Sequence, residues 1–149
     1  MTLPRLVASF GGAGFLQPAP GTWGSLVALL LGGLLLAAGG WVLLAACAVL
    51  AVAAGLWAIP RAGGESDPGW VVIDEAAGMW LTMLPLHGPS PIGMAVAFAL
   101  FRLLDITKPG PIGAIDRMHG PVGVMGDDVL AGLVGAIVLW VLVVTLLPS

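Results

Sequence analysis

The chain has 149 residues, of which 59% are hydrophobic and 9% charged, with a mean hydropathy of +1.08. Because soluble globular domains carry about 25% charged residues, this composition predicts a polytopic integral membrane protein built as an all-α helical bundle. The net charge of −3 argues against nucleic-acid binding, which requires a basic face. Cys47 is the only cysteine, which excludes disulfides and thiolate metal clusters within one chain. Composition does not change along residues 1–149, so a single domain is expected.

The first two apolar segments predict a helical hairpin. Ser25 to Ala38 reads as a short helix, which Gly39-Gly40 ends in a tight turn. Trp41 to Ile59 returns with about 19 residues, enough at 1.5 Å per residue to cross a hydrocarbon core roughly 30 Å thick. Pro60 is expected to close this second helix.

A short apolar segment that begins with two acidic residues follows a polar loop. Asp74-Glu75 opens the apolar stretch Ala76 to Leu86, which is too brief to span a membrane unaided. It is expected either to start earlier, near Trp70, or to be re-entrant. Small-residue pairs such as Gly32-Gly33 offer close helix packing within the chain or between chains.

The last part of the chain predicts two further helices joined by a loop. Ile92 to Ile106 is expected to end at Lys108-Pro109, because the residue before a proline avoids helical angles. Residues 107–126 contain several Gly and Pro and read as a loop. Asp127-Asp128 is expected to start the last helix, Val129 to Leu147, for a total of four to five membrane segments, one of them short or re-entrant.

The charges fall on one side of this predicted bundle. Alternating crossings put the amino terminus, the loop after Arg61 and the 107–126 loop together, with all five Lys and Arg residues. The positive-inside rule makes that side cytoplasmic. All eight acids are expected there too, while the opposite side has only turns, including one at His87, and the carboxyl terminus. We therefore expect the function at the cytoplasmic face of the membrane.

Acids beside apolar segments are costly and tend to mark function. Six residues meet this description: Asp74, Glu75, Asp105, Asp116, Asp127 and Asp128. Helix capping is an alternative for Asp127, since an acid at a helix N-terminus gains about 0.3–1 kcal/mol. Asp105 lies near a helix end, where the dipole disfavours an acid, and an ion pair with Arg102 one turn before it is the alternative there.

The residue types favour metal-assisted phosphoryl chemistry. Carboxylates without thiolates suit a hard cation such as Mg²⁺ and disfavour zinc. A metal with Arg and Lys beside it can neutralise a reacting phosphoryl group. The turn from Pro18 to Ser25 leads into a helix N-terminus, which either presents N–H groups to a phosphate or is a structural turn only.

Several phosphatase and transferase classes are excluded by missing motifs. The chain has no Cys followed five residues later by Arg and no histidine-dependent lipid-phosphatase signature. It also lacks the Asp-x-Asp nucleophile pair of haloacid-type phosphatases and the signature of CDP-alcohol transferases. Metal-assisted hydrolysis remains as the chemistry that the acids and bases could share.

Four blocks of the sequence resemble the phosphatidylglycerophosphatase A family, in the family's order and over most of the chain. They are Pro20 to Ser25, Ile73 to Trp80, Phe101 to Arg117 and Gly126 to Gly132. The third block is the most specific, with a Phe-Arg-x-x-Asp-x-x-Lys-Pro core and a later Asp-Arg. Met79 and Gly110 depart from the pattern, since the family often has a glutamine and an aromatic residue there.

The resemblance implies Mg²⁺-dependent hydrolysis of phosphatidylglycerophosphate to phosphatidylglycerol and phosphate at the bacterial inner membrane. The phospholipid and the bilayer would be the partners. It also implies that the six acids named above form the catalytic set. A phosphatase for another lipid phosphate, such as phosphatidic acid, and a small non-enzymatic Mg²⁺-binding transporter are the alternatives.

Charge pattern and motif match together suggest roles for these residues. Asp105, Asp127 and Asp128 are expected to bind the metal, with Asp74 or Glu75 as a further ligand or as the base that orients water. Asp105 is preferred over Asp116, because a helix end fixes a side chain better than a Gly/Pro loop. The expected phosphate-binding residues are Arg102, Lys108, Arg117, Gly21, Thr22, Gly24 and Ser25.

Overall fold

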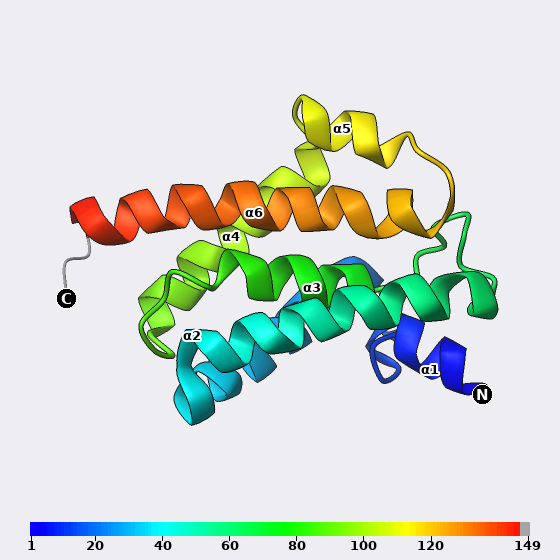
Figure 1. The fold of residues 1–149 in the computed structure, drawn as a ribbon, viewed down its shortest axis with the longest axis horizontal. Coiled ribbons are helices and arrows are strands. Elements are labelled where there is room, and N and C mark those ends of the chain that lie inside the picture. Colours follow the sequence, from blue (N-terminus) through cyan, green and yellow to red (C-terminus); the bar gives the residue numbers. More distant parts are fainter. Residues whose placement is uncertain (147–149) are drawn as a thin grey trace.

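The computed structural model describes residues 1–146, which form helices and connecting turns without a strand among them. Figure 1 shows the long helices lying side by side. The elements are α1 (Leu3–Ala8), the 3₁₀ turn η1 (Ala13–Phe15), α2 (Pro20–Ala62), α3 (Ile73–Thr82), α4 (Pro91–Thr107), α5 (Pro111–Asp116) and α6 (Gly120–Leu146). The all-α prediction is confirmed. Leu147, the predicted end of the last helix, lies outside the described residues.

α2 is two helical legs joined at Gly40. Gly40 has φ 67° and ψ −163°, a backbone conformation that glycine adopts without a Cβ clash. The legs run in opposite directions in Figure 1, so the predicted Gly39-Gly40 turn is confirmed. The prediction that Pro60 ends the second leg was wrong. The helix continues to Ala62 and ends at Gly63, because a proline this near the helix end removes only one hydrogen bond of the last turns.

α3 is the buried centre of the bundle. Nine of its ten residues are buried, and it packs against α2 and α6. The Nε1 of Trp80 donates a 2.7 Å hydrogen bond to the carbonyl oxygen of Ala28 and so ties α3 to the first leg of α2. At 1.5 Å per residue α3 is about 15 Å long, too short to cross a membrane. It begins at Ile73 and ends at Thr82, earlier than the predicted Ala76 to Leu86 segment.

The prediction of a continuous loop over residues 107–126 was wrong. Residues 111–116 form α5, and α6 begins at Gly120. Pro111 and Pro121 do not interrupt these helices, because proline is well tolerated in the first turn. Asp127 and Asp128 therefore lie seven and eight residues inside α6, which excludes the capping alternative for Asp127.

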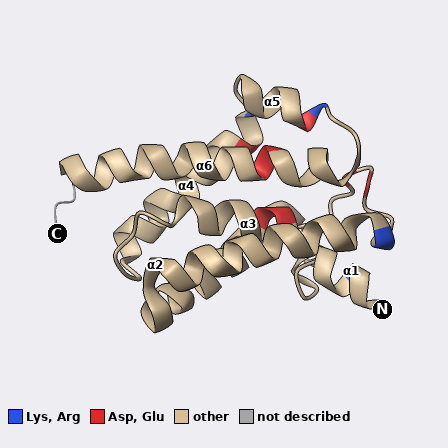
Figure 2. Ribbon diagram, in the orientation of Figure 1, with Lys and Arg blue, Asp and Glu red and all other residues tan. Residues whose placement is uncertain are grey.

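Within residues 1–146, two helices, α2 and α6, are long and apolar enough to cross a membrane. The predicted number of four to five membrane segments stays a prediction. Figure 2 shows the charged residues gathered toward the end of the molecule where α2 ends and α6 begins. The Gly40 turn, the α3–α4 connection and the end of α6 lie at the other end.

Candidate active site

Five buried acids meet in one cavity of about 280 Å³ at the charged end. The cavity lies among the start of α2, the α2–α3 connection, the first turn of α3, the end of α4 and the early part of α6. The acids are Asp74, Glu75, Asp105, Asp127 and Asp128. Exposed fractions from 2% for Asp128 to 9% for Glu75 mean that their charges require compensating partners.

Arg102 links three helices through its guanidinium group. Its Nη1 bonds Oδ2 of Asp105, one turn along α4, and lies 3.2 Å from Oε2 of Glu75 on α3. Its Nη2 donates to Oγ1 of Thr22 on α2 at 3.3 Å. The Arg102–Asp105 ion pair, which was the alternative for these residues, is therefore present, but as one part of a contact spread over two guanidinium nitrogens, whereas a lysine ammonium has only one nitrogen.

Lys108 supplies a second cation between α4 and α6. Its Nζ lies 2.6 Å from Oδ2 of Asp127, 3.2 Å from Oδ1 of Asp116 and 3.7 Å from Oδ1 of Asp105. Burial alone would lower the pKa of Lys108, but the hydrogen bond to Asp127 and the surrounding carboxylates outweigh it and raise the pKa. Lys108 is thus held as a cation facing the acids.

The pKa of Glu75 is raised to about 8, because burial and the neighbouring Asp105 disfavour its charged form. The Arg102 charge and a hydrogen bond from Ser25 act in the opposite direction and only partly offset this effect. A carboxyl group that titrates near neutral pH suits a general base.

Asp128 has one buried carboxylate oxygen, Oδ2, without a hydrogen-bond partner among residues 1–146. Leaving such an oxygen unpaired costs about 1–3 kcal/mol or more, so it marks a place for a ligand. The acids form two sets whose ligand atoms lie within 4.8 Å of one another, and both sets include Asp128: Asp74, Glu75 and Asp128, and Asp105, Asp127 and Asp128. A donor set of carboxylate oxygens fits a hard cation such as Mg²⁺.

Comparison with known proteins identifies the family to which this helical bundle belongs. The family model described as phosphatidylglycerophosphatase A matches residues 6–143. The chain belongs to the phosphatidylglycerophosphatase A family. It is therefore a phosphatase.

Three bacterial relatives of this phosphatase match over most of their length. A Bacteroides thetaiotaomicron protein, provisionally named a phosphatidylinositol-3-phosphatase, is 39% identical over 88% of this chain and 87% of its own. Proteins of Haemophilus influenzae and Escherichia coli, both named phosphatidylglycerophosphatase A, are 36% and 35% identical over 91% of this chain and 86% and 81% of their own. No solved structure matches the chain. The relatives and the two long apolar helices identify a membrane protein.

The start of α2 contacts one of the buried acids, Glu75, through Ser25. Oγ of Ser25 lies 2.9 Å from Oε2 of Glu75 and 2.8 Å from the carbonyl oxygen of Gly21. Gly21 lines the cavity. Gly24 instead packs against Val72, the residue before α3, because a Cβ on Gly24 would lie 2.7 Å from Cβ of Val72. Direct phosphate contact by Gly21, Thr22, Gly24 and Ser25 stays a prediction.

Arg117 and Asp116 lie at a neighbouring cavity of about 270 Å³, apart from the five buried acids. Both are exposed at the end of α5, and Asp116 reaches the main cluster through Lys108. Asp67 lines both cavities but was not among the predicted site residues. In the sequence, Asp67 is an acid directly before Pro68 in a Gly-rich loop. No apolar helix adjoins it, so the criterion of acids beside apolar segments did not select it.

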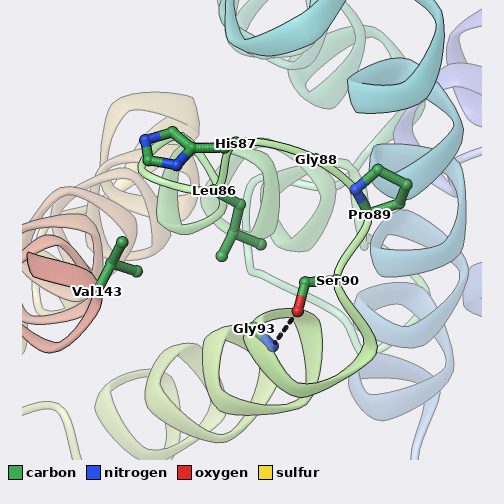
Figure 3. A pocket seen from close by; sticks show the side chains of 7 residues that line it. All are labelled: Leu86, His87, Gly88, Pro89, Ser90, Gly93 and Val143. Atoms are coloured by element: carbon green, nitrogen blue, oxygen red, sulfur yellow. Dashed lines mark hydrogen bonds between the residues drawn. The ribbon is translucent and has the colours of Figure 1, made fainter. Parts of the chain in front are cut away.

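A cavity of about 420 Å³ lies away from the five buried acids, at the α3–α4 connection. Figure 3 shows that its polar side chains are His87 and Ser90, and that Oγ of Ser90 accepts a hydrogen bond from the backbone N–H of Gly93 at the start of α4. Ser90 thus caps a helix. None of the described residues that line this cavity has a carboxylate side chain, and the acids gather at the other cavity instead.

Proposed function

We propose that this member of the family is a Mg²⁺-dependent lipid phosphatase that hydrolyses phosphatidylglycerophosphate to phosphatidylglycerol and phosphate. The reaction takes place at the cytoplasmic face of the bacterial inner membrane. One observation carries the proposal: five buried carboxylates and Lys108 line a single cavity at the charged end of the bundle, and Arg102 forms ion pairs with two of these carboxylates.

Asp105, Asp127 and Asp128 would hold the metal, with Asp74 as a further ligand. The unpaired Oδ2 of Asp128 and the 4.8 Å spacing of the ligand atoms support this assignment within the described chain. Bound Mg²⁺ supplies charge neutralisation for phosphoryl oxygens and lowers the pKa of coordinated water.

Arg102 and Lys108 would hold the substrate phosphate. Both reach the cavity acids, and each contacts two or more carboxylates. A phosphate group offers the same kind of anionic oxygen as these carboxylates, so either cation can exchange one partner for the other. Glu75, with its pKa near 8 and its hydrogen bond from Ser25, is the preferred base to accept a proton from the attacking water.

The lipid would stay in the bilayer during the reaction. We propose a multi-pass arrangement of four to five segments with the amino terminus in the cytoplasm. The gathering of charge toward one end of the bundle supports it, since basic residues favour the cytoplasmic side. The apolar helices hold the acyl chains, while the headgroup meets the cavity at the interface.

Phosphatidylinositol 3-phosphate is a second candidate substrate, favoured by the name of the 39% identical relative. It presents the same chemistry, a phosphate monoester on a lipid headgroup. Family membership argues against the transporter alternative, and so does the position of the acids toward one end of the helices.

The experiment is a phosphate-release assay on purified protein in mixed micelles, with Mg²⁺ or with EDTA. Phosphatidylglycerophosphate, phosphatidic acid and phosphatidylinositol 3-phosphate are compared. We expect Mg²⁺-dependent release that is fastest from phosphatidylglycerophosphate. Faster release from another lipid would overturn the substrate assignment, and equal release in EDTA would overturn the metal dependence.

A further inference from the structure

We infer that the site binds a second divalent cation, held by Asp74, Glu75 and Asp128, beside the ion at Asp105, Asp127 and Asp128. The inference rests on the proposed function for the first ion and concerns the number of ions. It moves Asp74 to the second ion and makes Glu75 a ligand of that ion in place of the general base.

The acids approach Asp128 from two directions. Asp74 and Glu75 come from the first turn of α3, whereas Asp105 lies in the last turn of α4 and Asp127 precedes Asp128 on α6. The ligand atoms of each set lie within 4.8 Å of one another, and Asp128 belongs to both sets. A carboxylate has two oxygens, so one side chain can bridge two ions.

The bridging residue is the one with the unexplained oxygen. Asp128 is 2% exposed, and its Oδ2 is unpaired with respect to residues 1–146. Its neighbours in the cluster are already fixed. Arg102 bonds Glu75 and Asp105, and Lys108 bonds Asp127. The unpaired oxygen therefore belongs to the residue that the two sets share.

Charge balance favours two ions over one. When all are ionised, the six carboxylates that line the cavity, which are the five buried acids and Asp67, outnumber Arg102 and Lys108 by four negative charges. One divalent cation leaves two negative charges, which would repel a phosphate monoester dianion. Two cations leave no net charge, which removes this repulsion. Paired ions sharing a ligand are suited to clamp both the attacking and the leaving oxygen of a phosphoryl transfer.

The local backbone holds the two acidic pairs in the same way. Oδ1 of Asp74 accepts a 3.0 Å hydrogen bond from the N–H of Glu75, and Oδ1 of Asp127 accepts one of the same length from the N–H of Asp128. These bonds orient the first acid of each pair. Ser25 orients Glu75 from the opposite side, so the second set is built of supported side chains.

Mn²⁺ binding to the full-length protein in detergent tests the inference. Equilibrium dialysis should give two Mn²⁺ per chain at saturation, and electron paramagnetic resonance should detect a spin-coupled pair. Asp74→Asn should reduce the stoichiometry to one and abolish the coupling. Glu65→Gln removes an exposed carboxylate at the neighbouring cavity and should retain two coupled ions.

One Mn²⁺ per wild-type chain would overturn the inference, as would a coupled pair that persists in Asp74→Asn. The wild-type stoichiometry requires no substitution, so it decides the matter even if the variant does not fold. Phosphate release measured on the same preparation separates the two proposals. If the protein releases phosphate with one bound ion, only the second ion is rejected. If it binds two ions but releases phosphate from no lipid, only the proposed function is rejected.

Discussion

Asp128 and Asp105 are the two acids of the buried cluster to which the proposal assigns metal binding, and replacing either with its amide isostere removes a negative charge. Asp128 has the unpaired oxygen within the described chain, and Asp105 contacts both Arg102 and Lys108. Asp116 is more exposed and belongs to neither ligand set found in the described residues. This agrees with the preference for Asp105, although the metal contact itself stays a prediction.

Asp128→Asn and Asp105→Asn are expected to abolish phosphate release without unfolding the protein. The amide keeps the shape of the side chain but removes its charge. Mg²⁺-dependent release should fall by about 10²-fold or more, while the circular dichroism spectrum in detergent stays helical. Near-normal activity in either variant would refute the role assigned to that residue.

Arg102→Lys is expected to reduce kcat/KM by about 10²-fold, although the positive charge is retained. A lysine ammonium cannot reproduce the fork to Glu75, Asp105 and Thr22. Arg61→Lys is the matched control, because Arg61 is exposed and its Nη1 donates to the carbonyl oxygen of Trp57 away from the cavity. Equal loss in both variants would show that Arg102 has no special role.

The approach of α3 to α6 brings the two acidic pairs together. Glycines at the crossing permit it: a Cβ on Gly78 would lie 2.6 Å from the carbonyl oxygen of Asp128, and one on Gly132 would lie 2.5 Å from the carbonyl oxygen of Gly78. Gly32 similarly faces Met83 and Trp80 within this chain, so its packing is intramolecular. The helix crossing therefore sets the distance between Asp74 and Asp128.

Gly132→Ala is expected to destabilise the protein by about 1–3 kcal/mol, because the added methyl forces α6 away from α3. Thermal unfolding in detergent measures this, and Mg²⁺-dependent activity should fall as the acid pairs separate. Gly88→Ala is the control, since a Cβ at Gly88 meets no atom of residues 1–146 within 4 Å. A neutral result for Gly132→Ala would contradict the close crossing.

The distribution of charge over the whole molecule gives it two unlike ends. Basic and acidic residues gather toward one end (Figure 2), and His87 lies at the cavity of the α3–α4 connection (Figure 3). In the topology that we propose, these ends face opposite sides of the bilayer, with the charged end in the cytoplasm.

Cysteine labelling tests this orientation in a Cys47→Ala background. Ser66→Cys and His87→Cys each put a thiol at an exposed position, one at each end. A membrane-impermeant maleimide should label His87→Cys in intact spheroplasts and Ser66→Cys only after the membrane is opened. Labelling of both from the same side would reject the proposed topology.

The amino-acid sequence alone was sufficient to predict the helical class, the Gly40 turn, the family and the identity of the clustered acids. These properties depend on composition, on local backbone preference and on short motifs, and none of them requires knowing which distant residues are in contact. The family blocks also contained both cations, Arg102 and Lys108, that contact the acids.

Only the tertiary structure decided which of these residues share a cavity. Gly120-Pro121 has the composition of a loop, yet it starts α6 and places Asp128 two turns inside the helix. Arg117 is the last residue of the third motif block but lines a different cavity, while Asp67 lies outside every block and lines the main cavity. Separation along the chain does not measure distance in space, because helix crossings such as Gly78–Gly132 bring residues about 50 positions apart into contact.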